Sequence, residues 1–122
     1  MANGITASRL ALGAALEGAG LRVAYDPGLV APPSVLVVPD APWIGLSRLV
    51  TRSRMVHWRV IAVAGRVDAT VTLEELEELV ALISLAVPRE LGSPAFDAPG
   101  TVDLAGAQYL AAVGRVDHIT EV

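Results

Sequence analysis

Few side chains in this chain have the types and spacing that chemistry at a site requires. Cysteine is absent, and the two histidines, His57 and His118, have no carboxylate at metal-ligand spacing. Histidines in such a setting are usually ordinary residues on the face of a strand. The segment around Ser47 lacks the second glycine of a nucleophile elbow. We therefore expect no catalytic residue, no metal and no cofactor, and we predict that the protein is not an enzyme.

Carboxylates gather at one place in the sequence, which holds Glu74, Glu75, Glu77 and Glu78. Glutamates without an accompanying histidine are typical of the first turns of a helix, where the helix dipole favours negative charge. A metal site is the less favoured interpretation. We expect a solvated acidic face that is also available to a partner.

Arginines form a second charged group, because four of the nine basic residues fall within 12 positions: Arg48, Arg52, Arg54 and Arg59. Two interpretations stay open, a solvated loop or a surface that contacts a partner or a DNA backbone. The acidic group offers a complementary surface. In a head-to-tail ring the two groups would lie on opposite sides of one repeated interface.

A helix over residues 72–87 carries the glutamates and has the clearest local signals in the chain. Thr72 and Glu75 form a capping box at its start, and Pro88 ends it. Its expected core stripe consists of Leu73, Leu76, Leu79, Val80, Ile83 and Val87. In its second half Leu82 and Leu85 extend the apolar surface around most of the helix. We expect this half to be covered by its own sheet and by another subunit.

A long strand over residues 55–64 precedes that helix and has two different faces. The face of Val56, Trp58, Val60, Ala62 and Ala64 is apolar throughout, so it should meet the helices. The other face is polar at His57 and Arg59 and apolar beyond them. One end of that face should therefore see solvent, a lumen or a neighbouring subunit.

The remaining elements follow from turn residues and apolar periodicity. An N-terminal helix over 4–19 should end at Gly20, with Leu21 folding back on Leu16. We expect further strands at 21–25, 34–38, 101–105 and 108–119, with a possible bulge at Gly114. Residues 39–42 should end the second strand, 43–53 should be a loop in which Trp43 fills a small local core, and 89–100 should be a loop or edge strand.

These elements predict one α+β domain over residues 1–122, with a mixed, mainly antiparallel sheet of four to five strands packed by two helices. The sequence shows no signal peptide and no membrane span of about 18 apolar residues, so we expect a soluble protein. The net charge of −4 argues against a general nucleic-acid binder. With 53% hydrophobic and only 18% charged residues, apolar surface should be left for copies of the chain to cover.

The order and spacing of these elements resemble the tail terminator proteins of long-tailed, siphovirus-like bacteriophages. The residues that carry the resemblance are the N-terminal helix up to Tyr25-Asp26-Pro27, P-P-S-V-L-V-V-P, the strand around Trp58, L-E-E-L-E-E-L-V-A-L-I, and A-G-A-Q-Y-L-A-A-V-G-R-V. The resemblance spans nearly the whole chain. It rests on layout and length, and other neck and tail-completion proteins share much of that layout.

The resemblance implies a structural virion protein, a small α+β subunit of a ring, typically a hexamer. Such a ring caps the tail tube protein, ends elongation, joins the head-side connector and lets DNA pass without sequence-specific binding. It would be assembled in the host bacterial cytoplasm and lie at the head-proximal end of the tail. The alternatives are another neck or head-completion protein and, less favoured, a small dimeric α+β ligand-binding domain or enzyme.

Overall fold

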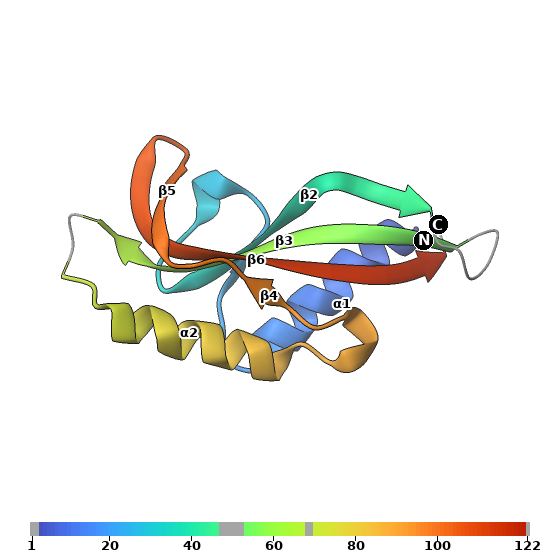
Figure 1. The fold of residues 1–122 in the computed structure, drawn as a ribbon, viewed down its shortest axis with the longest axis horizontal. Coiled ribbons are helices and arrows are strands. Elements are labelled where there is room, and N and C mark those ends of the chain that lie inside the picture. Colours follow the sequence, from blue (N-terminus) through green and yellow to red (C-terminus); the bar gives the residue numbers. More distant parts are fainter. Residues whose placement is uncertain (1–2, 47–52, 68–69, 122) are drawn as a thin grey trace.

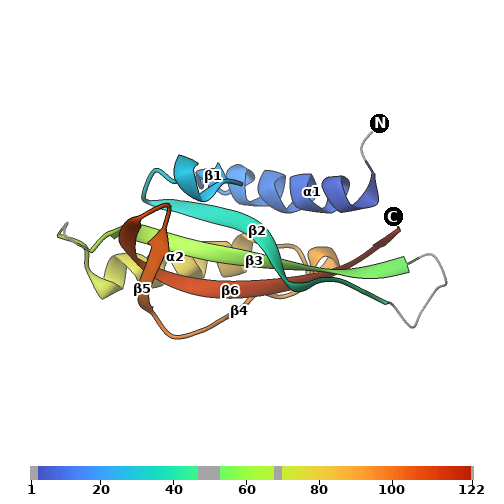
Figure 2. The same ribbon diagram turned by 90° about the horizontal axis from the view of Figure 1, so that it is seen from above.

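The computed structural model describes residues 3–46, 53–67 and 70–121, which form an α+β fold of two helices and one six-stranded sheet. The sequence predicted this class, with one or two fewer strands. Figure 1 shows two long strands, β3 and β6, at the centre with α2 running beside them, and Figure 2 shows α1 stacked over the strands.

The two helices begin and end where local signals place them. In α2 (Leu73–Ala86), the Thr72 side chain accepts a hydrogen bond from the Glu75 backbone N–H, and the Thr72 N–H donates to the Glu75 carboxylate. This confirms the predicted capping box. In α1 (Gly4–Gly18), Gly20 has φ +85° and the Leu21 N–H donates to the Leu16 carbonyl at 3.2 Å, which confirms the predicted helix ending.

The sheet order is β1-β2-β3-β6-β4, and β5 also pairs with β6. The strands are β1 (Val23–Ala24), β2 (Ser34–Leu46), β3 (Ser53–Arg66), β4 (Ala95–Phe96), β5 (Gly100–Leu104) and β6 (Ala107–Glu121). The β1–β2 pair is parallel and the other pairs are antiparallel. Two short 3-10 helices, η1 (Pro27–Leu29) and η2 (Arg89–Leu91), lie in the connections.

One face of the sheet is covered by both helices, as the alternation in β3 predicted. Val56, Trp58 and Val60 of β3 are at most 1% exposed. They belong to one core cluster with Leu12 and Leu16 of α1 and with three residues of α2, Leu76, Leu79 and Ile83. The apolar face of β3, which has a period of two, thus packs in one layer against the apolar faces of α1 and α2, which have the helical period.

The opposite face is covered at one end only. Ile61 and Val63 of β3 are packed in a second, smaller cluster with Leu36 of β2, Leu104 of β5 and Tyr109 of β6. Farther along the same face, β3 carries His57 and Arg59, which are partly exposed. The predicted change from apolar to polar along this face is therefore confirmed, and the polar end lies where this second core stops.

The predicted end of the second strand at residues 39–42 is wrong, and so is the loop over 43–46. The β2 strand runs on to Leu46, with a register irregularity between Pro39 and Ile44. Beyond Leu36, β1 no longer pairs with β2, so prolines there cost no ladder hydrogen bond on the outer side. Ser53 belongs to β3, and residues 47–52 of the predicted loop lie outside the described residues.

Three smaller predictions also need correction. Leu73, placed in the core stripe of the second helix, is 53% exposed because it opens the helix before the sheet is reached. Gly114 is not a bulge: it pairs regularly with Val60, and the irregularity of the β3–β6 pair lies at Val63–Gly65. Trp43 is 44% exposed rather than enclosed, and its ring meets Trp58 edge-on at 6.3 Å.

Candidate functional site

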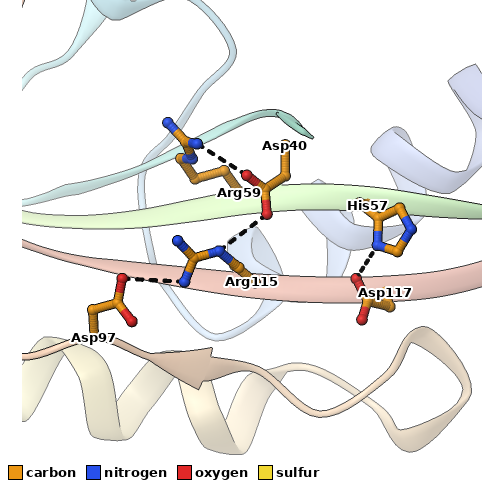
Figure 3. Close-up of polar contacts among 6 residues, drawn as sticks. All are labelled: Asp40, His57, Arg59, Asp97, Arg115 and Asp117. Atoms are coloured by element: carbon orange, nitrogen blue, oxygen red, sulfur yellow. Dashed lines mark hydrogen bonds and ion pairs between the residues drawn. The ribbon is translucent and has the colours of Figure 1, made fainter. Parts of the chain in front are cut away.

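The polar end of the open sheet face holds a group of paired charges, which we call the charged cluster: Asp40, Arg59, Arg115 and Asp97. The register of the sheet brings these side chains together. Arg59 of β3 is paired directly with Arg115 of β6, which would place two like charges side by side. Asp40 comes from the irregular part of β2 and lies between them (Figure 3).

The Asp40 carboxylate binds both guanidinium groups. Arg59 Nη2 donates to Asp40 Oδ1 at 2.9 Å, and Arg115 Nε lies 3.2 Å from Asp40 Oδ2. Arg115 Nη1 also donates to Asp97 Oδ2 at 3.1 Å. The cluster therefore links β2, β3 and β6 to the segment after β4, and its two cations balance its two anions.

Burial and charge act against each other at Asp40, whose side chain is only 8% exposed. Burial raises the pKa of Asp40, but the Ala41 backbone N–H and the two arginines outweigh burial and bring this pKa below its usual 3.8. Hydrogen bonding and charge from Asp97, with a contribution from Asp40, raise the pKa of Arg115. Both groups stay charged near neutral pH, so the cluster is a permanent set of ion pairs.

The two histidines lie on opposite faces of the sheet. His57 Nδ1 lies 2.5 Å from Asp117 Oδ1 on the open face, next to the charged cluster (Figure 3). His118 Nδ1 contacts the Ser8 hydroxyl at 2.7 Å on the helix face, and Trp58 Nε1 donates to the same hydroxyl at 2.9 Å. Burial lowers the pKa of His118 below its usual 6.5. Both histidines are strand-face residues, as predicted, and each has a polar partner.

The residues predicted to form an interface are distributed over two parts of the chain. Arg48 and Arg52 lie outside the described residues, Arg54 is half-buried near the start of β3, and Arg59 belongs to the charged cluster. In α2 the predicted acidic residues Glu74, Glu75 and Glu78 are exposed. Leu82 is 47% exposed and Leu85 is 86% exposed. The structure thus brings the glutamates and the leucines together on α2 and places Arg59 on the opposite side of the sheet.

Grooves run along both sides of α2. One, of about 560 Å³, lies towards the end of α1 and has Arg22 on one side and Glu75, Glu78 and Leu82 on the other. The second, of about 320 Å³, lies between α2 and the segment around β4, and its lining includes Val80, Phe96 and Pro99. A helix that carries exposed leucines between two grooves has the shape and polarity of a docking surface.

Sequence reasoning missed four members of the polar end: Asp40, Asp97, Arg115 and Asp117. Each side chain has a partner on another element, and the partners lie between 18 and 60 residues away in the three hydrogen-bonded pairs Asp97–Arg115, Asp40–Arg59 and His57–Asp117. The strand assignment for residues 108–119 contained the useful signal. Alternation along that strand puts Arg115 and Asp117 on one face, as it puts His57 and Arg59 on one face of the central strand.

Within residues 3–46, 53–67 and 70–121, no three His, Asp or Glu side chains gather closely enough to hold a metal ion. In the same part of the chain, no helix has the length and apolar character needed to cross a membrane.

No protein-family model matches the chain, and no curated protein matches it.

Proposed function

We propose that this chain is a structural subunit of a phage tail, which assembles with its own copies into a ring that ends the tail tube. The exposure of Leu85 and Leu82 on α2 carries the assembly part of this proposal. Both residues lie outside the buried face of α2, which is formed by Leu76, Leu79 and Ile83. Their exposure in a monomer leaves apolar area in water at a cost of about 25 cal/mol per Å². Coverage by another copy removes that cost.

The tail-terminator part of the proposal comes from the layout of the chain. The α+β fold, with both helices on one face of a mainly antiparallel sheet, agrees with the architecture expected from the resemblance. The partners are then other copies of the chain, the tail tube protein and the head-side connector, with DNA passing through the lumen. The balanced charges of the charged cluster fit a surface that does not hold DNA phosphates tightly.

Imaging of the purified protein, alone and after mixing with preformed tail tubes, tests this function. We expect rings, free in solution or seated at one end of each tube, and tubes that stop lengthening once capped. Light scattering should give a particle mass several times that of the 12.7 kDa chain. A protein that stays monomeric with and without tubes contradicts the proposal.

Two other outcomes would identify the alternatives. Binding to the head-side connector but not to the tube would indicate a neck or head-completion protein. A small molecule that remains bound in native mass spectra would indicate a ligand-binding domain, and the 560 Å³ groove beside Arg22 would be the first place to locate it.

A further inference from the structure

The outward face of α1 is apolar and uncovered. Its opposite side buries Ser8, Leu12 and Leu16 against the sheet. Facing away from the sheet are Ala7, Leu10, Ala11, Ala14 and Gly18, all exposed, with Leu10 at 49%. These positions follow the three- and four-residue spacing of one helix face, and the exposed Glu17 borders it, three residues after Ala14.

The outward face of α2 is a mixed surface with a clear division. Glu74 and Glu78 are exposed on its first turns, and Leu82 and Leu85 are exposed one and two turns later. No ion pair in the described part of the chain engages Glu78, or Arg22 just after α1. One subunit thus has an apolar helix face followed by a cation and a second apolar face preceded by an anion. Arg22 and Glu78 line the same groove of one subunit and form no ion pair with each other there.

We propose that the outward face of α2 in one copy binds the outward face of α1 in the next copy. This inference rests on the proposed function and names the two surfaces through which the ring would form. When a single α2–α1 contact joins each pair of copies, the contact is head-to-tail, and repeated head-to-tail contacts give a ring when the rotation closes. Two copies that make the α2–α1 contact twice would give a two-fold dimer, which its mass would distinguish from a ring. A contact of α2 with α2, or of α1 with α1, would give a two-fold dimer instead.

The spacing of the side chains sets the direction of the pairing. Glu78 and Leu85 are seven residues apart, about 10.5 Å along the helix, and Gly18 and Ala11 are separated by the same distance. In an antiparallel pair, Leu85 enters the hole bordered by Leu10, Ala11 and Ala14, Leu82 lies against Ala14, and Glu78 lies opposite Gly18. Glu78 then approaches Arg22 of the next copy. In a parallel pair Glu78 would lie near Ala11, in the middle of α1 and far from Arg22.

Two further charged residues, Arg9 and Glu17, lie on α1. Glu17 is exposed on the flank of the helix, where its charge adds to burial in raising the pKa of Tyr25. The Tyr25 ring also lies beneath Arg9, whose guanidinium carbon is 5.4 Å from the ring centre. Arg9 thus contacts Tyr25 of its own subunit, and Arg22 is the cation that we expect to meet the neighbour.

Disulfide cross-linking gives a direct test because the chain contains no cysteine. Ala11→Cys protein is mixed with Leu85→Cys protein and oxidised, so that a bond between positions 11 and 85 can form only between copies. We expect a covalent dimer in the mixture and little in either variant alone. Leu73→Cys, on the exposed first turn of α2, is the matched control and should not cross-link to Ala11→Cys.

A charge exchange provides the second arm. Arg22→Glu and Glu78→Arg should each weaken assembly, and the double variant should restore it, because each interface again holds one cation and one anion. Loss in the singles without recovery in the double would overturn the antiparallel pairing. Circular dichroism shows whether every variant is folded, which all should be, since both side chains lie on the surface.

The outcomes separate this inference from the proposed function. Rings in the wild type without a bond between positions 11 and 85 would overturn the inference and leave the ring intact. Efficient cross-linking of Leu85→Cys alone would show a two-fold contact and would also overturn it. A wild-type protein without rings, together with no cross-link, would count against both.

Discussion

At the scale of single residues, Asp40 has the most consequential position in the sheet. It separates Arg59 from Arg115, which are directly paired on neighbouring strands, and it is largely buried while doing so. Removing a carboxylate from such a place leaves two cations facing each other and hydrogen bonds unmade. The effect should therefore exceed that of removing an exposed partner of the same arginines.

Asp40→Asn should lower the free energy of unfolding by about 1–2 kcal/mol, because the neutral amide no longer balances the two guanidinium charges. Urea unfolding at pH 7 measures this change. Asp97→Asn is the control, since the Asp97 side chain is 61% exposed and is paired with Arg115, and it should have a smaller effect. Equal effects of the two variants would show that Asp40 has no special role.

Acid titration tests the direction of the Asp40 pKa shift. The pKa of Asp40 is lowered in the folded protein, so Asp40 contributes stability above the unfolded pKa near 3.8. That contribution is lost as the pH falls through the lower folded pKa. We expect the wild type to lose stability faster than Asp40→Asn in this acid range, and parallel curves would contradict the assignment.

His118 predicts a pH dependence nearer to neutrality. Because burial lowers the pKa of His118 in the folded protein, the unfolded chain takes up its proton first, near pH 6.5. Stability should be complete above that pH and decline below it until the folded pKa is passed. Urea midpoints at pH 7.5, 6.5 and 5.5 should fall more in the wild type than in His118→Gln. If the urea midpoint changes equally with pH in the two proteins, His118 does not contribute to the pH dependence of stability.

At the scale of elements, the short edge strand β4 depends on a missing side chain in β6. Phe96 of β4 is paired with Gly114, and a Cβ added at Gly114 would lie 2.6 Å from Cε1 of the Phe96 ring. The ring therefore occupies the space that any other residue would need. This close approach, rather than a bulge, explains why glycine stands in the middle of the longest strand.

Gly114→Ala should lower stability by about 1–3 kcal/mol, because the Phe96 ring must move and overpacking is costly. Thermal unfolding measures the change, and adding Phe96→Ala should reduce the further cost of the alanine. Gly18→Ala is the control. No atom lies within 4 Å of a Cβ there, so alanine should leave stability unchanged or raise it by up to about 1 kcal/mol.

At the scale of the whole molecule, the two sides of the sheet are unequally covered. Both helices lie on one face, whereas the other face has its own small core at one end and paired charges at the other. The apolar residues left exposed on α2 are not needed for this core, because the helices already pack against the sheet through their other face. Assembly and folding should therefore be separable by mutation.

Leu85→Glu should reduce association of the chain by at least about tenfold while leaving the stability of the monomer within about 0.5 kcal/mol, since the side chain is 86% exposed. Analytical ultracentrifugation and thermal unfolding provide the two readouts. Leu29→Glu is the matched control, because Leu29 is 73% exposed on η1, away from α2. Equal loss of association in both variants would argue against a specific role of α2.

The sequence by itself determined the elements whose signals are local. The capping box at Thr72, the glycine ending at Gly20 and the two faces of the central strand each depend on residues within a few positions of one another. The fold class followed from these elements, because a period of two and a period of 3.6 leave few ways to bury both apolar faces.

Only the tertiary structure decided which residues meet across the sheet. Pro39 did not end β2 because the outer edge of that strand has no partner there, and no local pattern shows which side of a strand lies at an edge. Asp40 reaches Arg115 through the register of three strands, and a shift of one residue would place them on opposite faces. The exposure of Leu85 likewise depends on how α2 turns against its sheet, which is set by packing between distant segments.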